Sequence, residues 1–281
     1  MLTTLPILLA LASSPSSQPA DDGARSWINN PDAFYQLSLH AELGFLASLS
    51  HTIQFGRDGT SFDYVQSGGQ DVLFPFLRLS ADLTLWKRHT VVFLYQPLDI
   101  KTRVLLDQDI LVDGQSFAKN TPMDLGYGFS FWRLSYLFDF FDDPATELAV
   151  GASLQIRNAN IDFASVDGTA YRAKRNIGPV PILKARARTD LGSSVWTAGE
   201  VDGFWAPIRY LNGGDSDVEG AIVDLSLKAG VHLMHGIDPF LGVRYIAGGA
   251  QGTNSSNKGP GDGFSDNWLH FVSVTLGTSL R

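Results

Sequence analysis

Residues 35–55 alternate between apolar and polar side chains over a longer stretch than any other pattern in the sequence. The odd positions are apolar, as at Leu39, and the even positions are polar, as at Glu42, with Leu46 as the large apolar exception. Successive side chains of a β-strand point to opposite faces, so one face of this segment is apolar and the other polar. The pattern therefore predicts a single strand, several times longer than the usual strand of about five or six residues.

The alternation returns, less regularly, in further segments, which gives about ten strands, an even number as in bacterial outer-membrane barrels. After Trp132 the apolar residues move to the other parity, and a β-bulge there would explain the change. The expected later strands are residues 73–85, 92–104, 123–138, 148–156, 180–191, 195–207, 221–233, 241–247 and 268–280. In the second of these, Asp99 lies on the polar face.

The connections between these segments alternate in length. Long polar connections are expected at residues 56–70, 107–121, 162–178, 211–219 and 249–267, and short ones at 87–89, 141–145, 192–194 and 234–238. Transmembrane barrels have short periplasmic turns and long external loops. We therefore expect an all-β, antiparallel up-and-down transmembrane β-barrel of about ten strands.

The composition is consistent with this fold and excludes several functions. Charged residues make up 18% of the chain and the mean hydropathy is +0.01, as expected where lipid-facing and lumen-facing residues alternate. The chain has no cysteine, which excludes disulfides, thiolate metal sites and thiol nucleophiles. A net charge of −8 argues against a nucleic-acid partner.

The N-terminal residues differ in character from the rest of the chain. Residues 1–20 contain a short apolar run ending in Ala10-Leu11-Ala12, which predicts a signal peptide; the alternative is a disordered tail. Residues 21–33 are a polar lead-in, and residues 34–281 form the expected barrel domain.

Most charges within the expected strands lie opposite the apolar face, which predicts a network of ion pairs in a narrow lumen. A turn centred near Ser193 sets Arg186 against Glu200 and Lys184 against Asp202. A turn near residues 88–89 sets Arg78 near Asp99. Such cross-strand pairs are favourable, and a lipid-facing Lys or Arg would cost about 2–4 kcal/mol.

The main basic cluster is Arg172, Lys174 and Arg175, in the expected loop before residue 180. One interpretation is an anion contact, for example with lipopolysaccharide phosphates. The other interpretation, which we favour, is a solvated loop combined with lumen ion pairs.

In its alternation, loop lengths and N-terminus, the chain from Tyr35 to Leu280 resembles bacterial outer-membrane β-barrel proteins as an architectural class. The resemblance implies residence in the outer membrane of a Gram-negative-type bacterium, with outer-membrane lipid as a partner. It implies no cofactor and leaves the oligomeric state open.

Ten-stranded barrels include the omptin proteases, which use aspartates and an Asp–His pair at the outer rim. The corresponding candidates here are Asp58, Asp63, His51, Asp215, Asp217 and His270, and His51 and His270 are expected to approach each other if the barrel closes. No omptin-like motif surrounds them, so we assign no catalytic residue and no metal ligand. A Ser–His arrangement is disfavoured because Ser50 and His51 are adjacent and point to opposite faces.

The leading hypothesis is a non-enzymatic outer-membrane barrel with a structural, surface or narrow-pore role and a charged, mostly occluded lumen. The alternatives are an outer-membrane hydrolase with its site on the extracellular loops, and an exported soluble β-barrel that binds a small apolar ligand. About eight strands already fill a barrel interior with side chains, which favours occlusion at about ten.

Overall fold

A computed structural model describes residues 33–141, 143, 145–207, 217–233, 236–254 and 261–281. The expected signal peptide, all but the last residue of the lead-in, and Asp215 lie outside this part. The strands are β1 (Tyr35–Phe55), β2 (Phe62–Asp63), β3 (Leu73–Leu85), β4 (His89–Gln96), β5 (Asp99–Leu105), β6 (Ile110–Val112), β7 (Gln115–Phe117), β8 (Pro122–Asp139), β9 (Thr146–Ser165), β10 (Tyr171–Asp190), β11 (Val195–Pro207), β12 (Glu219–Val231), β13 (Ile237–Thr253) and β14 (Phe264–Leu280). The described part of the chain contains no helix that is long and apolar enough to cross a membrane.

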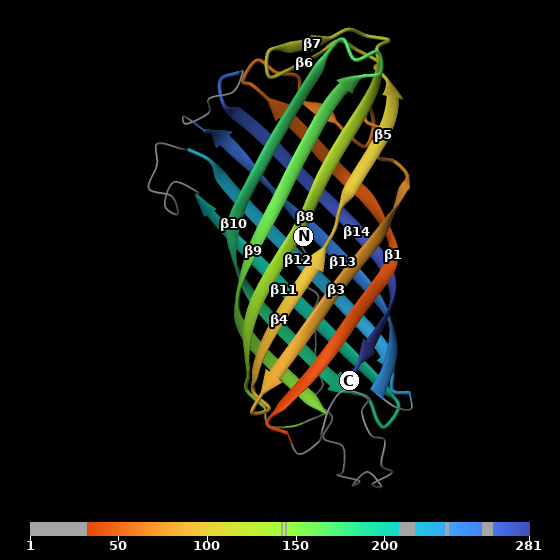
Figure 1. The fold of residues 1–281 in the computed structure, drawn as a ribbon, viewed down its shortest axis with the longest axis vertical. Helices are drawn as coiled ribbons and strands as arrows, with labels where there is room; N and C mark the ends of the chain where they lie inside the picture. Colours follow the sequence, from red (N-terminus) through yellow and green to blue (C-terminus); the bar gives the residue numbers. More distant parts are fainter. Residues whose placement is uncertain (1–32, 142, 144, 208–216, 234–235, 255–260) are drawn as a thin grey trace, which may run out of the picture.

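The strands form a closed antiparallel barrel in which each wall strand pairs with its neighbours in the sequence (Figure 1). The ladder between β1 and β14, from Leu39↔Leu280 to Phe55↔Ser265, closes the wall. The main sheet has 12 strands. Since β4 and β5 are two parts of one wall strand, and β2 is a two-residue flap on β1, the wall has ten strands, as expected.

The short turns and the end of β14 at Leu280 lie at one end of the barrel, which we call the lower end (Figure 1). The upper end carries the longer connections, one of which contains β2 and another the small β6–β7 hairpin. The predicted long loop at residues 162–178 is wrong. There β9 and β10 pair continuously up to Ala164↔Tyr171, so the connection is short and the basic cluster lies on a strand.

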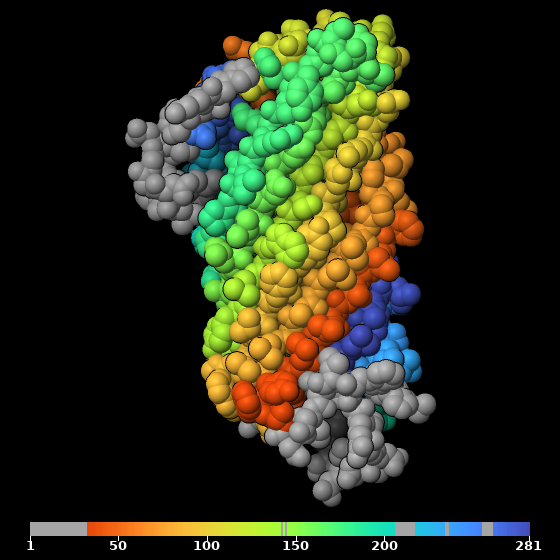
Figure 2. All heavy atoms as spheres, in the orientation of Figure 1, coloured from red at the N-terminus to blue at the C-terminus, as the bar shows by residue number. Residues whose placement is uncertain are grey.

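The side chains of the wall change environment halfway up the barrel. In the lower half the outward residues are apolar and exposed, as at Leu43 (63%) and Leu276 (64%), and many of the inward residues are charged. In the upper half the inward residues are apolar and buried, as at Tyr127 and Phe163, and the outward ones include Asp99 and Lys101. Such an inversion is what a lipid belt around the lower half and water around the upper half would produce. Figure 2 shows the tilted outer surface of the wall.

The inversion explains where the sequence pattern changes parity. The β-bulge expected after Trp132 is wrong, because β8 pairs with β9 without interruption from Met123 to Asp139. Phe131 and Arg133 both point inward, one into the apolar half and the other into the charged half. The alternation of inward and outward side chains along β8 is regular, and only the environment inside the barrel changes between Phe131 and Arg133.

The register shift of the wall lies instead in β1, between Ser48 and Ser50 against β14. Below it the odd-numbered residues face outward, and above it His51, Ile53 and Phe55 are buried inside. The sequence interpretation that put these three on the lipid face is therefore wrong. The bulge lets β1 keep apolar residues at odd positions on both sides of the inversion.

One part of the upper wall has no ladder. The ladder of β3 with β4 covers only Leu79–Leu85, and β5 pairs only with β8 in the described sheet. Pro75, which has no backbone N–H, lies in the part of β3 beyond this ladder. The segment 64–72 packs behind the opening, where Thr102 Oγ1 donates to the carbonyl of Gly68 at 2.6 Å.

Candidate functional site: a lumen filled in two layers

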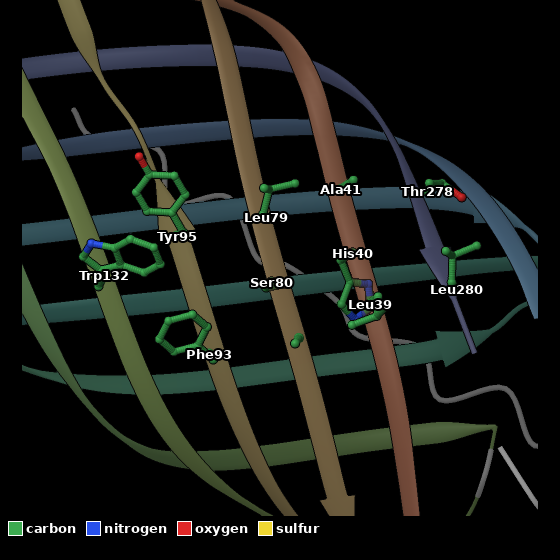
Figure 3. A pocket seen from close by; sticks show the side chains of 11 residues that line it. Leu39, His40, Ala41, Leu79, Ser80, Phe93, Tyr95, Trp132, Thr278 and Leu280 are labelled. Carbon is green, nitrogen blue, oxygen red and sulfur yellow. The ribbon is translucent and has the colours of Figure 1, made fainter. Parts of the chain in front are cut away.

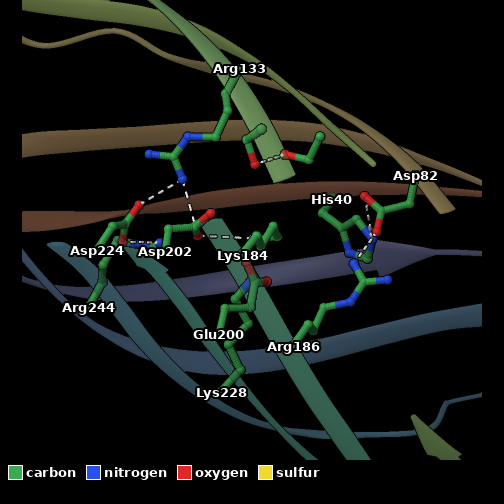
Figure 4. A network of polar contacts seen from close by, with 12 residues as sticks. His40, Asp82, Arg133, Lys184, Arg186, Glu200, Asp202, Asp224, Lys228 and Arg244 are labelled. Carbon is green, nitrogen blue, oxygen red and sulfur yellow. Dashed lines mark hydrogen bonds and ion pairs between the residues drawn. The ribbon is translucent and has the colours of Figure 1, made fainter. Parts of the chain in front are cut away.

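The lower half of the lumen holds a network of buried ion pairs, formed by inward residues of most wall strands (Figure 4). Glu42 of β1 lies against Lys228 Nζ at 2.9 Å, Arg244 Nη2 at 3.8 Å and Arg78 Nε at 3.9 Å. Arg78 also donates from Nη1 to Gln96 Oε1 at 2.8 Å. A single carboxylate thus joins residues from β3, β12 and β13.

The centre of the network is Arg133, whose side chain is 1% exposed. Its Nη1 lies 3.1 Å from Asp202 Oδ2 and 3.3 Å from Asp224 Oδ2, and its Nε and Nη2 donate to Gln155 Oε1. Asp224 also accepts from Arg244 Nη1 at 2.6 Å. These contacts run across the lumen as well as along neighbouring strands.

A second part of the network extends from β10. Lys184 Nζ donates to Glu200 at 2.6 Å and Asp202 at 3.0 Å, and Arg186 contacts Asp82 at 2.5 Å and Glu147 at 2.8 Å. The network contains equal numbers of acidic and basic residues: Glu42, Asp82, Glu147, Glu200, Asp202 and Asp224, with Arg78, Arg133, Lys184, Arg186, Lys228 and Arg244. It therefore fills the lumen without a net charge that would concentrate ions of one sign.

Five of the six residues that the sequence assigns to this network lie in it. The β10–β11 register sets Lys184 opposite Asp202 and Arg186 opposite Glu200, as expected from the turn near Ser193. Arg186 nevertheless makes its closest ion pairs with Asp82 and Glu147 on other strands.

The placement of Asp99 in the lumen is wrong. Its side chain is 62% exposed on the outer wall and lies 3.1 Å from Lys101 Nζ. The β3–β4 register puts Leu79 opposite Tyr95, and Arg78 instead contacts Gln96. Because Asp99 lies beyond the break between β4 and β5, in the upper half, its outward side chain reaches water.

The upper half of the lumen is filled by an apolar core. Phe62 and Tyr64, from the connection between β1 and β3, insert among wall residues such as Phe163, whose ring centroid is 5.6 Å from that of Phe62. Residues of the wall and of the upper connections complete this core: Leu46, Ile53, Phe55, Phe76, Leu98, Ile100, Leu106, Ile110, Val112, Phe117, Met123, Leu125, Tyr127, Ile161, Leu269 and Phe271. The loops thus close the upper half of the lumen with their own side chains.

His51 lies within this core and not at a membrane interface. It is fully buried, its ring stacks on Tyr64 at 4.6 Å, and its Nδ1 is 2.9 Å from Gln70 Oε1. Ser48 points inward like the other even-numbered residues below the bulge and donates to the same Gln70 oxygen at 3.5 Å, and the bulge turns His51 to this side as well. These contacts of Gln70 hold the connection between β1 and β3 against β1, and the surrounding core shields them from solvent.

The remaining rim candidates do not form one site. His270 alternates with buried Leu269 and Phe271, so it faces outward, where its Nδ1 is 2.6 Å from Tyr245 Oη; His51 and His270 are on opposite sides of the wall. Asp63 accepts from the backbone N–H groups of Val65 and Gln66, and Asp217 from that of Thr253. Asp58 lies exposed in the turn after β1. Among the described residues, no group of three or more His, Asp or Glu side chains is arranged to hold a metal ion.

The wall divides the basic cluster. Arg172 and Lys174 point inward, where Arg172 donates to the carbonyl of Asp113 and Lys174 lies 4.8 Å from the Phe55 ring centroid. Arg175 points outward and donates to Asn160 Oδ1 at 3.1 Å. A single anion therefore cannot contact all three side chains in this arrangement.

Sequence reasoning missed the centre of the network, including Glu42, Arg133 and Asp224. Their positions on polar faces were visible in the alternation, but hairpin registers show only neighbouring strands. The contacts of these three residues cross the lumen, between strands far apart in the sequence, such as the pair Arg133–Asp224.

A closed ten-stranded wall, an apolar outer belt and a charged interior define the class of the protein: in architecture the chain is an outer-membrane β-barrel protein. Among solved structures, it is similar to the outer membrane protease OmpT from Escherichia coli, at 7% identity over 87% of this chain and 96% of that one, with a TM-score of 0.49. It is also similar to the transport unit of the autotransporter AIDA-I from Escherichia coli (10% identity, 91% and 93% covered, TM-score 0.43) and to the toluene transporter TodX of Pseudomonas putida (10%, 90% and 91%, 0.33). No protein-family model and no curated protein sequence matches the chain.

Proposed function

We propose that the protein is an occluded barrel of the bacterial outer membrane with a structural or surface role. The observation that carries this proposal is the filling of the lumen at two levels, by a neutral ion-pair network below and an apolar core above. An ion would have to displace buried salt bridges and then cross a layer of aromatic and aliphatic side chains. The free energy of transferring a charge into such a layer is prohibitive.

Planar-bilayer recordings of the purified, refolded protein test the closed lumen. The expected result is no stable conductance, in contrast to a water-filled porin of about sixteen strands measured in parallel. A second sample carries Glu42→Ala, Arg78→Ala, Asp224→Ala and Arg244→Ala, which removes equal numbers of each charge. It is also expected to stay closed, because the apolar core remains; stable single-channel steps from the unmodified protein would overturn the proposal.

Residence in the outer membrane is part of the same proposal. The outward belt of exposed leucines, valines and aromatic residues in the lower half supports it, because such a surface would be costly in water. Fractionation of expressing cells, combined with the heat-dependent gel mobility of folded barrels, tests it. Recovery of folded protein in a detergent-free soluble fraction would instead favour a soluble exported barrel.

A further inference from the structure

A groove on the outside of the lower half lies within the apolar belt (Figure 3). It has a volume of about 420 Å³ and spans outward residues of β14, β1, β3, β4 and β8. Its shallow floor includes Ala41 and Ala81, which lie opposite larger residues of the neighbouring strands, Leu79 for Ala41 and Leu39 for Ala81. Each alanine therefore leaves a hollow between bulkier side chains.

Stacked aromatic rings form one side of the groove. The ring centroid of Trp132 is 4.0 Å from that of Tyr95 and 5.4 Å from that of Phe93, with the rings close to parallel in both pairs. Leu280 and Thr278 form the opposite side. The same strands turn Glu42, Arg78 and Asp82 into the lumen, so the groove itself presents apolar surface to the bilayer.

Below the groove, the β3–β4 hairpin ends in two cations. Lys87 is exposed in the turn and Arg88 follows it, and no ion pair of either occurs among the described residues. Trp86, beside them, is 64% exposed and lies 5.9 Å from the Phe34 ring. Cations flanked by aromatic residues are typical of the depth at which lipid headgroups lie.

Two residues of this turn, Trp86 and Lys87, have an unfavourable backbone conformation. Arg88 N donates to the carbonyl of Leu85 at 3.2 Å, and the two central residues, Trp86 and Lys87, have φ values of 47° and 65°. This type I′ geometry strongly favours Asn-Gly. Bulky residues held in the left-handed region point to a use for their side chains.

The spacing of the groove and the cations matches a lipid. β3 continues for four residues from Ala81 to Leu85, about 13 Å along the strand, and the turn with Lys87 adds about one further residue length, which gives about 17 Å. With the usual strand tilt of about 35–45°, the turn lies about 13 Å below Ala81, which is close to half of a hydrocarbon core of about 30 Å. If the turn is at headgroup depth, the groove is near the bilayer midplane.

We propose that this strip of β3 and β4 binds one anionic phospholipid of the inner leaflet. Its phosphate contacts Lys87 and Arg88, and the end of one acyl chain occupies the groove. The assignment of the leaflet rests on the proposed function, in which the short turns face the periplasm. The occupant is a phospholipid because the groove opens within the lipid belt and the cations lie one acyl-chain length below it.

Native mass spectrometry of the folded protein, with phosphatidylglycerol titrated into the detergent, tests the site. The unmodified protein is expected to retain one phosphatidylglycerol in preference to phosphatidylcholine. The double variant Lys87→Gln/Arg88→Gln is expected to bind it about tenfold more weakly. Ala81→Phe, which fills the groove, is expected to weaken binding of both lipids.

Matched variants separate this site from general effects of the surface. Lys101→Gln removes an exposed cation of the upper wall, and Ala152→Phe adds the same ring to another outward position; both are expected to bind like the unmodified protein. Trp86→Asn/Lys87→Gly is expected to stabilise the turn while losing lipid. Unchanged binding in the double Gln variant, or equal losses in Ala81→Phe and Ala152→Phe, would overturn the site.

Insertion into vesicles is measured on the same samples. Barrels that insert and show heat-dependent mobility but do not distinguish the two lipids contradict the lipid site and leave the proposed function standing. If no sample inserts into any bilayer, the proposed function itself fails.

Discussion

At the scale of single residues, Asp224 lies among three guanidinium groups at the centre of the lumen. Arg244, Arg133 and Arg78 lie 2.6, 3.3 and 3.8 Å from its oxygens, and its own side chain is 1% exposed. Removing the charge would leave the three buried guanidinium groups to share Glu42 and Asp202, one negative charge short.

Asp224→Asn is therefore expected to lower the free energy of unfolding by about 3–5 kcal/mol. Urea unfolding of the barrel in lipid vesicles, followed by tryptophan fluorescence, measures the change. The matched variant Asp99→Asn removes an exposed partner of Lys101 and is expected to change stability by less than about 1 kcal/mol. An equal decrease in the free energy of unfolding in the two variants would show that the ion pairs of Asp224 in the lumen do not stabilise the barrel.

The charged residues also show how much of the lumen network could be predicted from the sequence. Lys184 and Asp202 could be set opposite each other because one short turn fixes the register of the β10–β11 hairpin. Asp99 could not be placed, since its apolar neighbours Leu98 and Ile100 look like a lipid face but pack into the upper core. Alternation identifies the two faces of a strand but not which face is inside.

At the scale of strands, the bulge of β1 determines which residues fill the upper core. Leu49 is exposed at the irregularity, and His51, Ile53 and Phe55 follow it on the inside. If β1 kept all its residues and ran on as a regular strand without the bulge, these three side chains would point outward and the residues between them inward.

Deletion of Leu49 and Ser50 together takes out one residue more than the bulge adds, so it turns His51, Ile53 and Phe55 outward. This deletion is expected to cost about 3–6 kcal/mol, because two large apolar side chains leave the core and the His51–Gln70 contact is lost. Unfolding in lipid vesicles and amide exchange in upper β1 measure the effect. Leu49→Ala keeps the bulge and trims an exposed side chain, so it is expected to cost less than about 1 kcal/mol. A deletion variant as stable as Leu49→Ala would contradict this role of the bulge.

The upper loops have a pH-sensitive contact outside the lipid belt. Asp262 accepts from the backbone N–H groups of Arg57 and Phe264, and these bonds hold the pKa of its carboxyl below the ordinary value. A depressed pKa in the folded state means that the contact stabilises the loops above the ordinary Asp range, about pH 4, and is lost as the pH falls through the lower folded value.

Amide exchange of Arg57 and Phe264 is therefore expected to speed up on acidification, beyond the intrinsic change with pH. In Asp262→Asn the protection of these two amides is expected to lose its pH dependence. The amide of Thr169, held by Asp167 at the tip between β9 and β10, provides an internal reference in both proteins. Identical profiles for the unmodified protein and the variant would refute the coupling.

At the scale of the whole molecule, the proposed membrane location places the barrel in two solvents. Strands β1, β9 and β10 have 21, 20 and 20 residues, twice the roughly ten that cross a bilayer, so their upper halves extend beyond it. The strand number and the closed fold followed from the sequence, because alternation and turn spacing are local signals. The apolar upper core did not, because its residues resemble lipid-facing ones until the level of the membrane is known.

The two solvents predict a different tolerance for charge at two outward positions. Leu227→Arg, in the belt and 72% exposed, is expected to cost about 2–4 kcal/mol in a bilayer. Asn158→Arg, also outward but on the upper half of β9, is expected to be nearly neutral. Unfolding of both variants in vesicles of the same lipid measures the difference, and equal costs would contradict the proposed height of the belt.

The missing ladder between upper β3 and β5 has a mechanical consequence. A barrel resists a radial force through its closed ring of hydrogen-bonded strands. In this barrel the β3–β4 ladder, and with it the closed ring, is complete only from Leu79 downward. Above it, the wall is slit, and the slit is bridged by contacts such as Thr102 to Gly68 instead of a row of backbone bonds. Under a pulling force applied at the upper rim, upper β3 and β5 are expected to separate from each other first, while the lower part of the wall stays closed.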